Sequence, residues 1–226
     1  MDELREGGEG MWNRVAVLCV LSILFCRKGG TMEEIALPQP RVTSEASLEE
    51  CIRERRSVRR YDAQVVGLEH VSQLCWAAQG ITDERRGLRA APSAGATYPL
   101  ELYVVNEDGL FRYLPRKHAL VRLSDSDLRA SLARAALGQD FIEEAPLDLV
   151  ITAVYSRTTR RYGDRGHRYV HMEVGHAAQN IHLQAVALGL SSVPVGAFYD
   201  EEVRDVLSLP EEEVPLYIVP VGYCTK

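Results

Sequence analysis

The segment ELYVVNEDGLFRYL, residues 101–114, consists of two runs rich in β-branched and aromatic residues, joined by the turn residues NEDG. Two such runs around a short turn are typical of a strand–turn–strand hairpin. The strands of a hairpin are antiparallel, and the helices and strands around this one alternate irregularly. The sequence therefore predicts an α+β fold with a mixed, largely antiparallel sheet flanked by helices, not a doubly wound parallel sheet.

Helices are predicted on both sides of the hairpin. Ser47–Glu50 has the spacing of a capping box and opens a short helix that ends at a cluster of arginines. Apolar spacing and stop signals predict four further helices, at Leu68–Gln79, about Asp125–Leu137, Tyr169–Leu188 and from Asp200 onward. Further strands are expected at Leu147–Tyr155, at the segment Ser191–Phe198 and at Pro215–Tyr223.

Composition limits the function classes. The 226 residues are 46% hydrophobic and 26% charged, which is ordinary for a globular protein. The net charge of −6 argues against general nucleic-acid binding. Five scattered cysteines contain no C-x-x-C pair, which argues against a disulfide framework and suits a reducing compartment such as the cytoplasm. His171 and His176 are five residues apart and cannot converge from one helix, so no metal site is expected.

The N-terminus carries an apolar run of twelve residues, Val15–Cys26. It is too short for a spanning helix and suits the apolar region of a signal peptide. We expect residues 1–31 to be a leader, a signal or anchor, or a mis-assigned start, followed by a linker at 32–46 and one domain at 47–226. Membrane contact would involve only residues 11–28, and a genuine signal there would make the protein anchored or exported.

Three segments predict a ligand site together. RRSVRRY (residues 55–61) combines guanidinium groups, which grip phosphate in two-point geometry, with a serine hydroxyl. APSAGATYP (residues 91–99) is built of small residues that permit close approach to a flat ligand. VPVGAF (residues 193–198) would present backbone N–H groups without bulky side chains. Together they indicate a site for a planar phosphorylated cofactor.

The region from about Leu37 to Tyr223 resembles the nitroreductase superfamily of FMN-dependent oxidoreductases, and within it the SagB/ThcOx-type dehydrogenases. Six segments in order carry the resemblance: RRSVRRY (55–61), APSAGATYPLELYVV (91–105), ALGQDFIEEAP (136–146), RYGDRGHRYVHMEVGHAAQN (161–180), LGLSSVPVGAF (188–198) and PLYIVPVGY (215–223).

The resemblance implies a set of cofactor-binding residues. Arg55 and Ser57 would grip the FMN phosphate with Arg56 close by, and Arg59 would lie against the pyrimidine edge of the ring. A fixed cation there would stabilise the anionic reduced flavin. The remaining matches are the loop Ser93, Ala94 and Gly95, which would reach the flavin of a partner subunit, Gln139 near the ring, and a backbone shelf at N5 made of Pro194, Val195, Gly196 and Ala197.

Two departures bear on the chemistry that the resemblance implies. Many nitroreductases carry glutamate where this chain has Gly196. Azoline oxidases use a Lys-Tyr pair as catalytic base, and the matching positions here are Arg161 and Tyr162. Arginine stays protonated and is a poor base, which argues against azoline oxidation, whereas Tyr162 could exchange a proton or simply pack.

The resemblance thus implies an oxidoreductase that passes hydride through flavin N5 to or from a small organic or peptide-derived substrate, with NADH or NADPH as a candidate donor. Two alternatives remain: a catalytically silent flavin-binding partner in a modification complex, and an arginine-rich interaction protein without a cofactor. The helix Tyr169–Leu188 reads as apolar nearly all round, and such a helix must be buried. With the resemblance, this predicts a two-fold homodimer with shared FMN sites.

Overall fold

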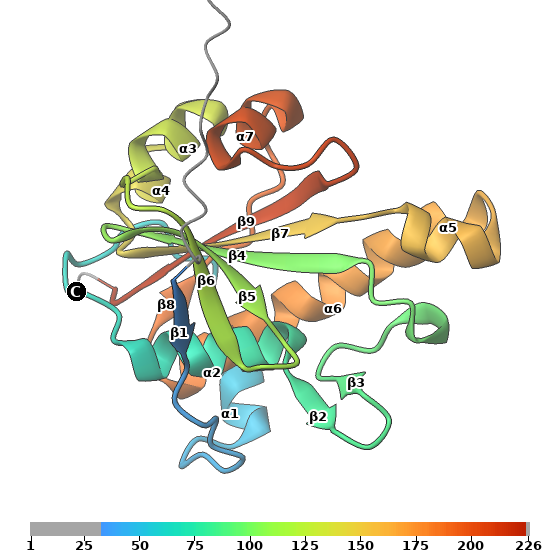
Figure 1. Cartoon of the computed structure of the whole chain (residues 1–226). Coiled ribbons are helices and arrows are strands. Elements are labelled where there is room, and N and C mark those ends of the chain that lie inside the picture. The colour runs from blue at the N-terminus through green and yellow to red at the C-terminus, as the bar shows by residue number, and fades with distance from the viewer. Residues whose placement is uncertain (1–32, 225–226) are drawn as a thin grey trace, which may run out of the picture. The chain divides into compact units, whose positions relative to one another are not determined.

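The computed structural model describes residues 33–224, and its central feature is a seven-stranded sheet (Figure 1). The strand order is β1-β6-β5-β4-β7-β9-β8. Their bounds are β1 Glu34–Ala36, β4 Leu100–Asn106, β5 Gly109–Leu114, β6 Ala119–Ser124, β7 Leu147–Ala153, β8 Ser191–Ser192 and β9 Val214–Gly222. A separate pair is formed by β2 Ile81–Asp83 and β3 Leu88–Arg89. The expected α+β class is confirmed.

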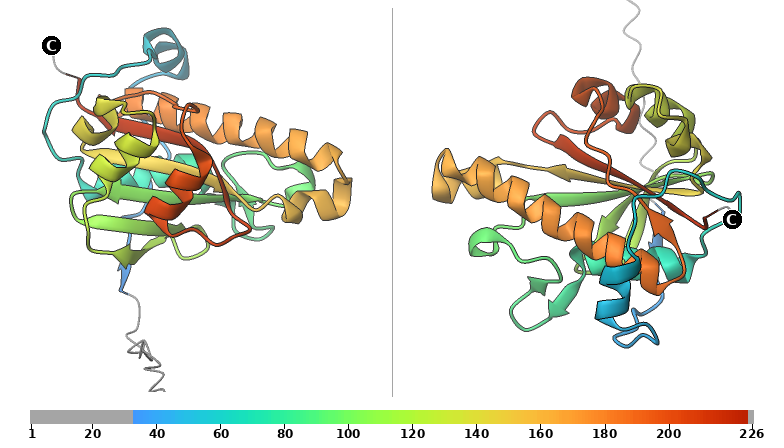
Figure 2. Two further views of the ribbon diagram at one scale, coloured as in Figure 1. Left: turned by 90° about the horizontal axis from the view of Figure 1, so that it is seen from above. Right: turned by 180° about the vertical axis from the view of Figure 1, so that it is seen from behind.

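Helices cover both faces of the sheet (Figure 2). One face carries α1 Leu48–Glu54, α2 Leu68–Gln79 and α6 Arg165–Ala187, and the other carries α3 Arg129–Ala135, α4 Asp140–Glu144 and α7 Asp200–Leu207. Helix α5, Ser156–Tyr162, lies at the end of the sheet and leads into α6. The chain between β3 and β4 forms a single 3₁₀ turn, η1 Ala94–Ala96.

Alternation along the central strands produces two cores. In β4, Leu102 and Val104 pack toward α2 and α6, whereas Tyr103 and Val105 pack toward α3 and α7. Successive side chains of a strand point to opposite faces, so a strand covered on both faces is buried at every position. Strand β7 shows this, since all of its residues are buried, including the polar Asp148 and Thr152.

Several expected boundaries are wrong. The helix predicted over Asp125–Leu137 begins only at Arg129, because Ser124 and Asp127 side chains accept hydrogen bonds from the backbone N–H groups of Ser126 and Arg129. Its last turn ends before Leu137 and Gly138, which both have φ near +65°. The long helix starts at Arg165, four residues early, directly after Gly163 ends α5 with φ of 56°.

Other corrections concern the sheet. Part of the expected linker forms β1, which pairs antiparallel with β6. All ladders between strands of the described region are antiparallel, and parallel pairing occurs there only at the single bridge between Ser57 and Ser192. The segment expected at 191–198 pairs as a strand only at β8 and at the Val195–Ile218 bridge.

Helix α6 is not apolar all round. Met172, His176 and Gln179 lie on an exposed face, while Val174, Ala178 and Ile181 are buried among other core residues. No described helix is long and apolar enough to cross a membrane. The expectations for residues 1–31, including the apolar run, lie outside the described residues.

Candidate functional site

The arginine-rich segment runs in extended form along the edge strand β8. The N–H of Val58 donates to the carbonyl of Ser192 over 3.2 Å, and Ser57 and Ser192 form a parallel bridge. At the far end, the hydroxyl of buried Tyr61 donates to the carbonyls of Val58 and Pro220 at 2.7 and 3.2 Å. The segment is therefore held at both ends, which leaves Arg56, Ser57 and Arg59 exposed.

Arg55 rests on a buried histidine. Its Nη1 lies 3.2 Å from Nε2 of His182, and Nδ1 of His182 lies 2.6 Å from Oγ of Ser192. Burial, and then the charge of Arg55, lowers the pKa of His182 to about 4. The neutral imidazole thus accepts from Arg55 at Nε2 and donates from Nδ1 to Ser192. This orients the guanidinium without neutralising it.

The positive charge of this segment has no carboxylate partner in the described part of the chain. None of Arg55, Arg56, Arg59 and Arg60 forms an ion pair there. Arg56 turns its Nη1 back onto the carbonyls of Arg53 and Arg55, at 2.8 and 2.7 Å. Uncompensated guanidinium groups held close together form a site for an anion, and phosphate geometry suits them.

The predicted backbone shelf lies beside the same edge. Val195 exchanges two hydrogen bonds with Ile218 of β9, at 2.7 and 3.0 Å. Gly196 and Ala197 follow in an exposed stretch, and a Cβ placed on Gly196 would meet only the ring of Tyr217, at 3.4 Å. Pro194 is half-buried. Gly196 and Ala197 therefore expose backbone without an obstructing side chain, whereas the N–H and carbonyl of Val195 are already bonded to Ile218.

Gln139 and its neighbour Phe141 connect the shelf to the arginine segment. The amide nitrogen of Gln139 donates to the carbonyls of Ala136 and Ala197, at 2.7 and 2.9 Å. Both N–H groups are thus engaged within the chain, and the amide oxygen is the group left to face a ligand. The Arg59 guanidinium lies 5.7 Å from the centre of the Phe141 ring.

The loop Ser93–Gly95 belongs to a second group of residues. Ser93 Oγ accepts from the N–H of Tyr98 over 2.9 Å, and Arg161 Nη1 donates to the carbonyl of Gly95 over 3.2 Å. Gly95 has φ of 59°, and a Cβ there would come within 2.6 Å of the Tyr162 hydroxyl. Glycine adopts this φ without strain, and the atoms closest to such a Cβ are the ends of the Tyr162 and Arg161 side chains.

Glu173 lies buried beneath this loop. It is 2% exposed, and its Oε1 has no hydrogen-bond partner among the described atoms. Burial raises its pKa to about 7, opposed by a hydrogen bond with Ser93 and by the charge of Arg89. Glu173 and His182 are nine residues apart on α6, roughly 14 Å along the axis at about 1.5 Å per residue. Within one chain, the two groups of predicted residues are separate.

Sequence reasoning missed both His182 and Glu173. Each interrupts the apolar stripe of α6, Glu173 beside Val174 and His182 beside Ile181. Burying a polar side chain costs free energy unless it has a hydrogen-bond partner. A glutamate and a histidine within an apolar stripe are therefore a sequence signal for a functional or hydrogen-bonded position. Among the described residues, no group of three or more His, Cys, Asp or Glu side chains is placed to hold a metal ion.

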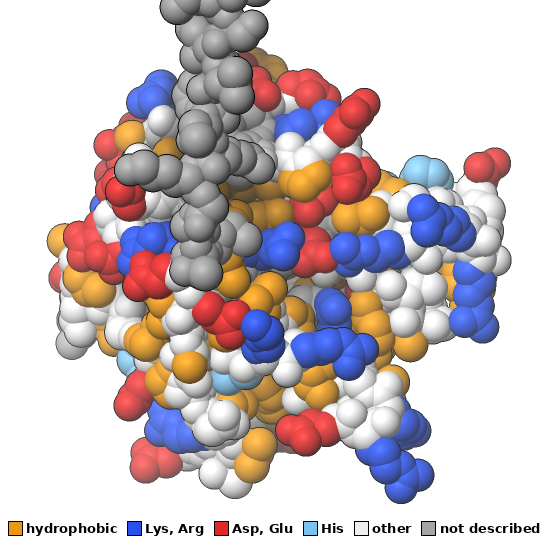
Figure 3. Space-filling view, in the orientation of Figure 1, with side chains coloured by type: hydrophobic (Ala, Val, Ile, Leu, Met, Phe, Trp, Pro, Cys, Tyr) orange, Lys and Arg blue, Asp and Glu red, His pale blue; other side chains and the backbone are white. Residues whose placement is uncertain are grey.

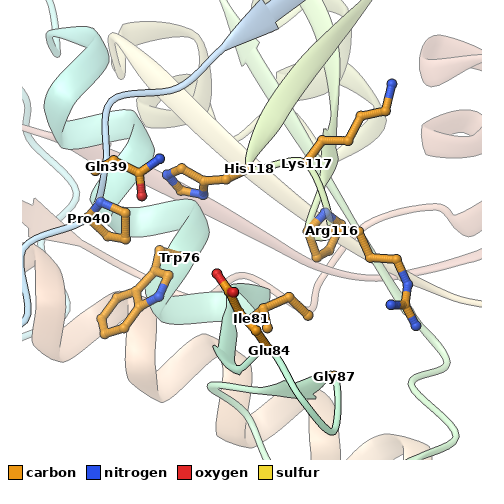
Figure 4. Close-up of a pocket in the computed structure, with 10 residues that line it drawn as sticks. Gln39, Pro40, Trp76, Ile81, Glu84, Gly87, Arg116, Lys117 and His118 are labelled. Atoms are coloured by element: carbon orange, nitrogen blue, oxygen red, sulfur yellow. The ribbon is translucent and has the colours of Figure 1, made fainter.

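A separate cavity of about 370 Å³ lies between α2, the β2–β3 turn and the β5–β6 turn (Figure 4). Trp76 and Glu84 line it, together with His118. Both ring nitrogens of His118 have hydrogen-bond partners within the chain, since Nε2 lies 2.8 Å from Ser72 Oγ and Nδ1 lies 2.8 Å from the Tyr113 hydroxyl. None of the site residues predicted from the sequence lines this cavity.

Known proteins share this architecture. A nitroreductase-family protein of Methanocaldococcus jannaschii is 51% identical over 200 residues, which cover 86% of this chain and 98% of that protein. The crystal structure of a nitroreductase-family protein from Ralstonia eutropha JMP134 superimposes with a TM-score of 0.79 at 33% identity, covering 87% of this chain and 92% of that one.

Two more distant relatives have named activities. The NADPH-flavin oxidoreductase of Vibrio harveyi is 28% identical over 164 residues, 69% of this chain and 63% of that protein. The microcin B17-processing protein McbC of Escherichia coli is 28% identical over 143 residues, 58% of this chain and 52% of that protein. The nitroreductase family model itself matches residues 52–223. The chain therefore belongs to the nitroreductase family.

Proposed function

We propose that the protein is an FMN-dependent oxidoreductase that binds its flavin beside β8 and β9. The convergence of the unpaired Arg55–Arg59 segment with the exposed backbone of Gly196–Ala197 carries this proposal, because it joins an anion site to a flat, side-chain-free surface. The relative named as an NADPH-flavin oxidoreductase supports a flavin and a nicotinamide donor, NADH or NADPH.

The residues present suit FMN. Arg55 is oriented by neutral His182 and, with Ser57, would hold the phosphate. Arg59 would place its charge at the pyrimidine edge, and the Gln139 amide oxygen would accept a hydrogen bond there. When bound, FMN supplies a two-electron carrier that takes hydride from a donor and passes it to an acceptor.

The separation of the two residue groups supports a shared site in a homodimer. Ser93–Gly95 would complete the site of the partner chain. The exposed apolar side chains of Leu48, Ile52 and Met172 would be buried against that chain. We expect the purified protein to have the mass of a dimer by light scattering, with one non-covalent FMN per chain. A monomer that holds one FMN per chain would contradict the shared site.

Replacing Arg59 with glutamine is expected to lower the reduction potential of the bound flavin, since a fixed cation near N1 stabilises the anionic reduced form. FMN should still bind. The measurement is a dye-equilibration titration of both proteins, with Arg60→Gln as the matched loss of charge. A potential that is unchanged in Arg59→Gln, or lowered equally in both variants, would place another group at that edge.

A SagB-type role with a peptide-derived substrate is the finer proposal, supported by the quoted segments and by the similarity to McbC. The second candidate is a catalytically silent flavin-binding partner in a modification complex. Steady-state turnover with NADH or NADPH and a generic acceptor separates the two. An enzyme consumes the nicotinamide with acceptor present, whereas a silent partner binds FMN without turnover.

A further inference from the structure

Two arginines and two tyrosines form a continuous surface where α5 meets α6. The Arg161 guanidinium lies 5.4 Å from the centre of the Tyr162 ring, and Tyr162 and Tyr169 meet edge to face at 5.1 Å. The Arg165 guanidinium lies 6.0 Å from the Tyr169 ring. Both tyrosines are half-buried and both arginines are exposed. We call these four residues the arginine–tyrosine patch.

The surroundings of the patch are strongly basic. Residues 156–171 contain five arginines and one aspartate, a formal charge of +4 in a chain whose net charge is −6. Of the five, only Arg157 forms an ion pair within the described residues, with Glu101 at 2.6 Å. Figure 3 shows basic side chains gathered over α5. Like charges held together without counter-charges repel one another, so an anion there would be favoured.

The patch adjoins the loop that we assign to the flavin site. Arg161 donates to the Gly95 carbonyl, and the Tyr162 hydroxyl would lie 2.6 Å from a Cβ at Gly95. A ligand lying on the patch would therefore contact the edge of the Ser93–Gly95 loop. On the proposed shared-site arrangement, that position is next to the reacting face of the partner chain's flavin.

We infer that the arginine–tyrosine patch selects an aromatic substrate that carries a carboxylate or phosphate group. Guanidinium groups bind these anions with charge-assisted hydrogen bonds, and tyrosine rings offer faces and edges for an aromatic ring at little cost in conformational entropy. This inference rests on the proposed function, because it names the class of substrate that the flavin site would serve.

The test compares two nitroaromatic acceptors of similar size, para-nitrobenzoate and para-nitrobenzyl alcohol. In Arg165→Gln, which leaves the hydrogen bond between Arg161 and the Gly95 carbonyl in place, we expect KM for the benzoate to rise roughly tenfold, the scale of losing a charge-assisted contact. KM for the neutral alcohol should stay within about twofold of the wild-type value. The control is Arg85→Gln, which removes one exposed arginine outside the patch.

Calorimetric titration of para-nitrobenzoate into each protein gives a second readout that needs no turnover. The patch variant should lose the binding heat that the wild type and control retain. If no protein turns over but the titration shows this loss, the proposed function fails and the patch stands as a binding site for an aromatic anion. The inference would be overturned if KM changed equally for both acceptors, or if the control lost the same binding heat. It would also be overturned if the patch variant became a monomer, because the patch would then bind a second copy of the chain.

Discussion

Replacing Arg55 with alanine is expected to weaken FMN binding by about 1.5–3 kcal/mol, the scale of a hydrogen bond to a charged group. At about 1.4 kcal/mol per factor of ten, Kd should rise between roughly tenfold and a hundredfold. The guanidinium is half-buried and held by His182 at 3.2 Å, so its side chain is already ordered before a ligand arrives. Less conformational entropy is then lost on binding.

The measurement is fluorescence titration of the flavin-free protein with FMN. Arg60→Ala removes the same charge from an exposed position five residues further along the chain and should change Kd by less than about threefold, as expected for a screened surface charge. If the two variants lose the same affinity, the effect of Arg55 is long-range attraction alone. If Arg55→Ala binds FMN as tightly as the wild type, the phosphate does not lie at this segment.

Substitutions of His182 test whether the orientation of Arg55, and not only its charge, contributes to FMN affinity. Replacing His182 with glutamine keeps an acceptor near Arg55, whereas alanine removes it and leaves the guanidinium unoriented. Affinity for FMN should therefore fall in His182→Ala and be largely restored in His182→Gln. A loss in both variants would instead point to packing around Ser192.

The central part of the fold was predictable because its signals are local. The hairpin at residues 101–114 has two alternating runs and a four-residue turn, and it appears as β4 and β5 with register set by pairing of Asn106 with Gly109. Ser47 caps α1 through Glu50 N–H at 3.0 Å, as its spacing predicts. Helix α2 has the predicted bounds, because its apolar face and Gly80 mark both its extent and its end.

The missed elements depend on contacts that sequence periodicity does not contain. Strand β1 has only three residues and exists because it pairs with β6. Helices α4 and α5 have five and seven residues, too few for an apolar stripe to repeat. Helix α5 ends at Gly163, where φ is 56°, and α6 then packs back on it so closely that a Cβ on Gly166 would lie 2.9 Å from Thr159.

In the candidate site too, local sequence signals predict the segments, whereas contacts between distant segments are not predictable. The chemistry of residues 55–59 and 194–197 indicates a ligand site, and pairing with β8 and β9 brings the two segments together in the fold. Their relation to His182 could not be read from the segment itself, because the histidine lies more than 120 residues away in sequence. The separation of Ser93–Gly95 from Arg55–Arg59 is likewise a property of the folded chain.

Glu173→Gln is expected to stabilise the protein by about 3 kcal/mol at pH 8, relative to its effect near pH 4.5. The folded pKa of Glu173 is raised from 4.5 to about 7 by burial. The unfolded chain therefore loses this proton first as pH rises, and the free energy of unfolding falls between about pH 4.5 and 7. A shift of this size, at about 1.4 kcal/mol per pKa unit, gives the stated magnitude.

His182 acts in the opposite direction over an overlapping range. Its folded pKa is lowered from 6.5 to about 4, so the unfolded chain binds the extra proton and stability rises with pH across that interval. The two slopes partly cancel in the wild type, which makes its own pH profile a poor test. The difference between Glu173→Gln and wild type removes the His182 contribution and isolates the carboxyl.

Urea unfolding of both proteins at pH 4.5, 6 and 8 measures this difference, with exposed Glu202→Gln as the matched control. The gain in Glu173→Gln should grow with pH and level off above about pH 7, while Glu202→Gln should show no such trend. A gain that is constant with pH would mean that Glu173 ionises in the folded protein as readily as in the unfolded chain. The loop Ser93–Gly95 would then rest on a charged carboxylate held by Arg89 and Ser93, not on a buried acid that gives up its proton near neutrality.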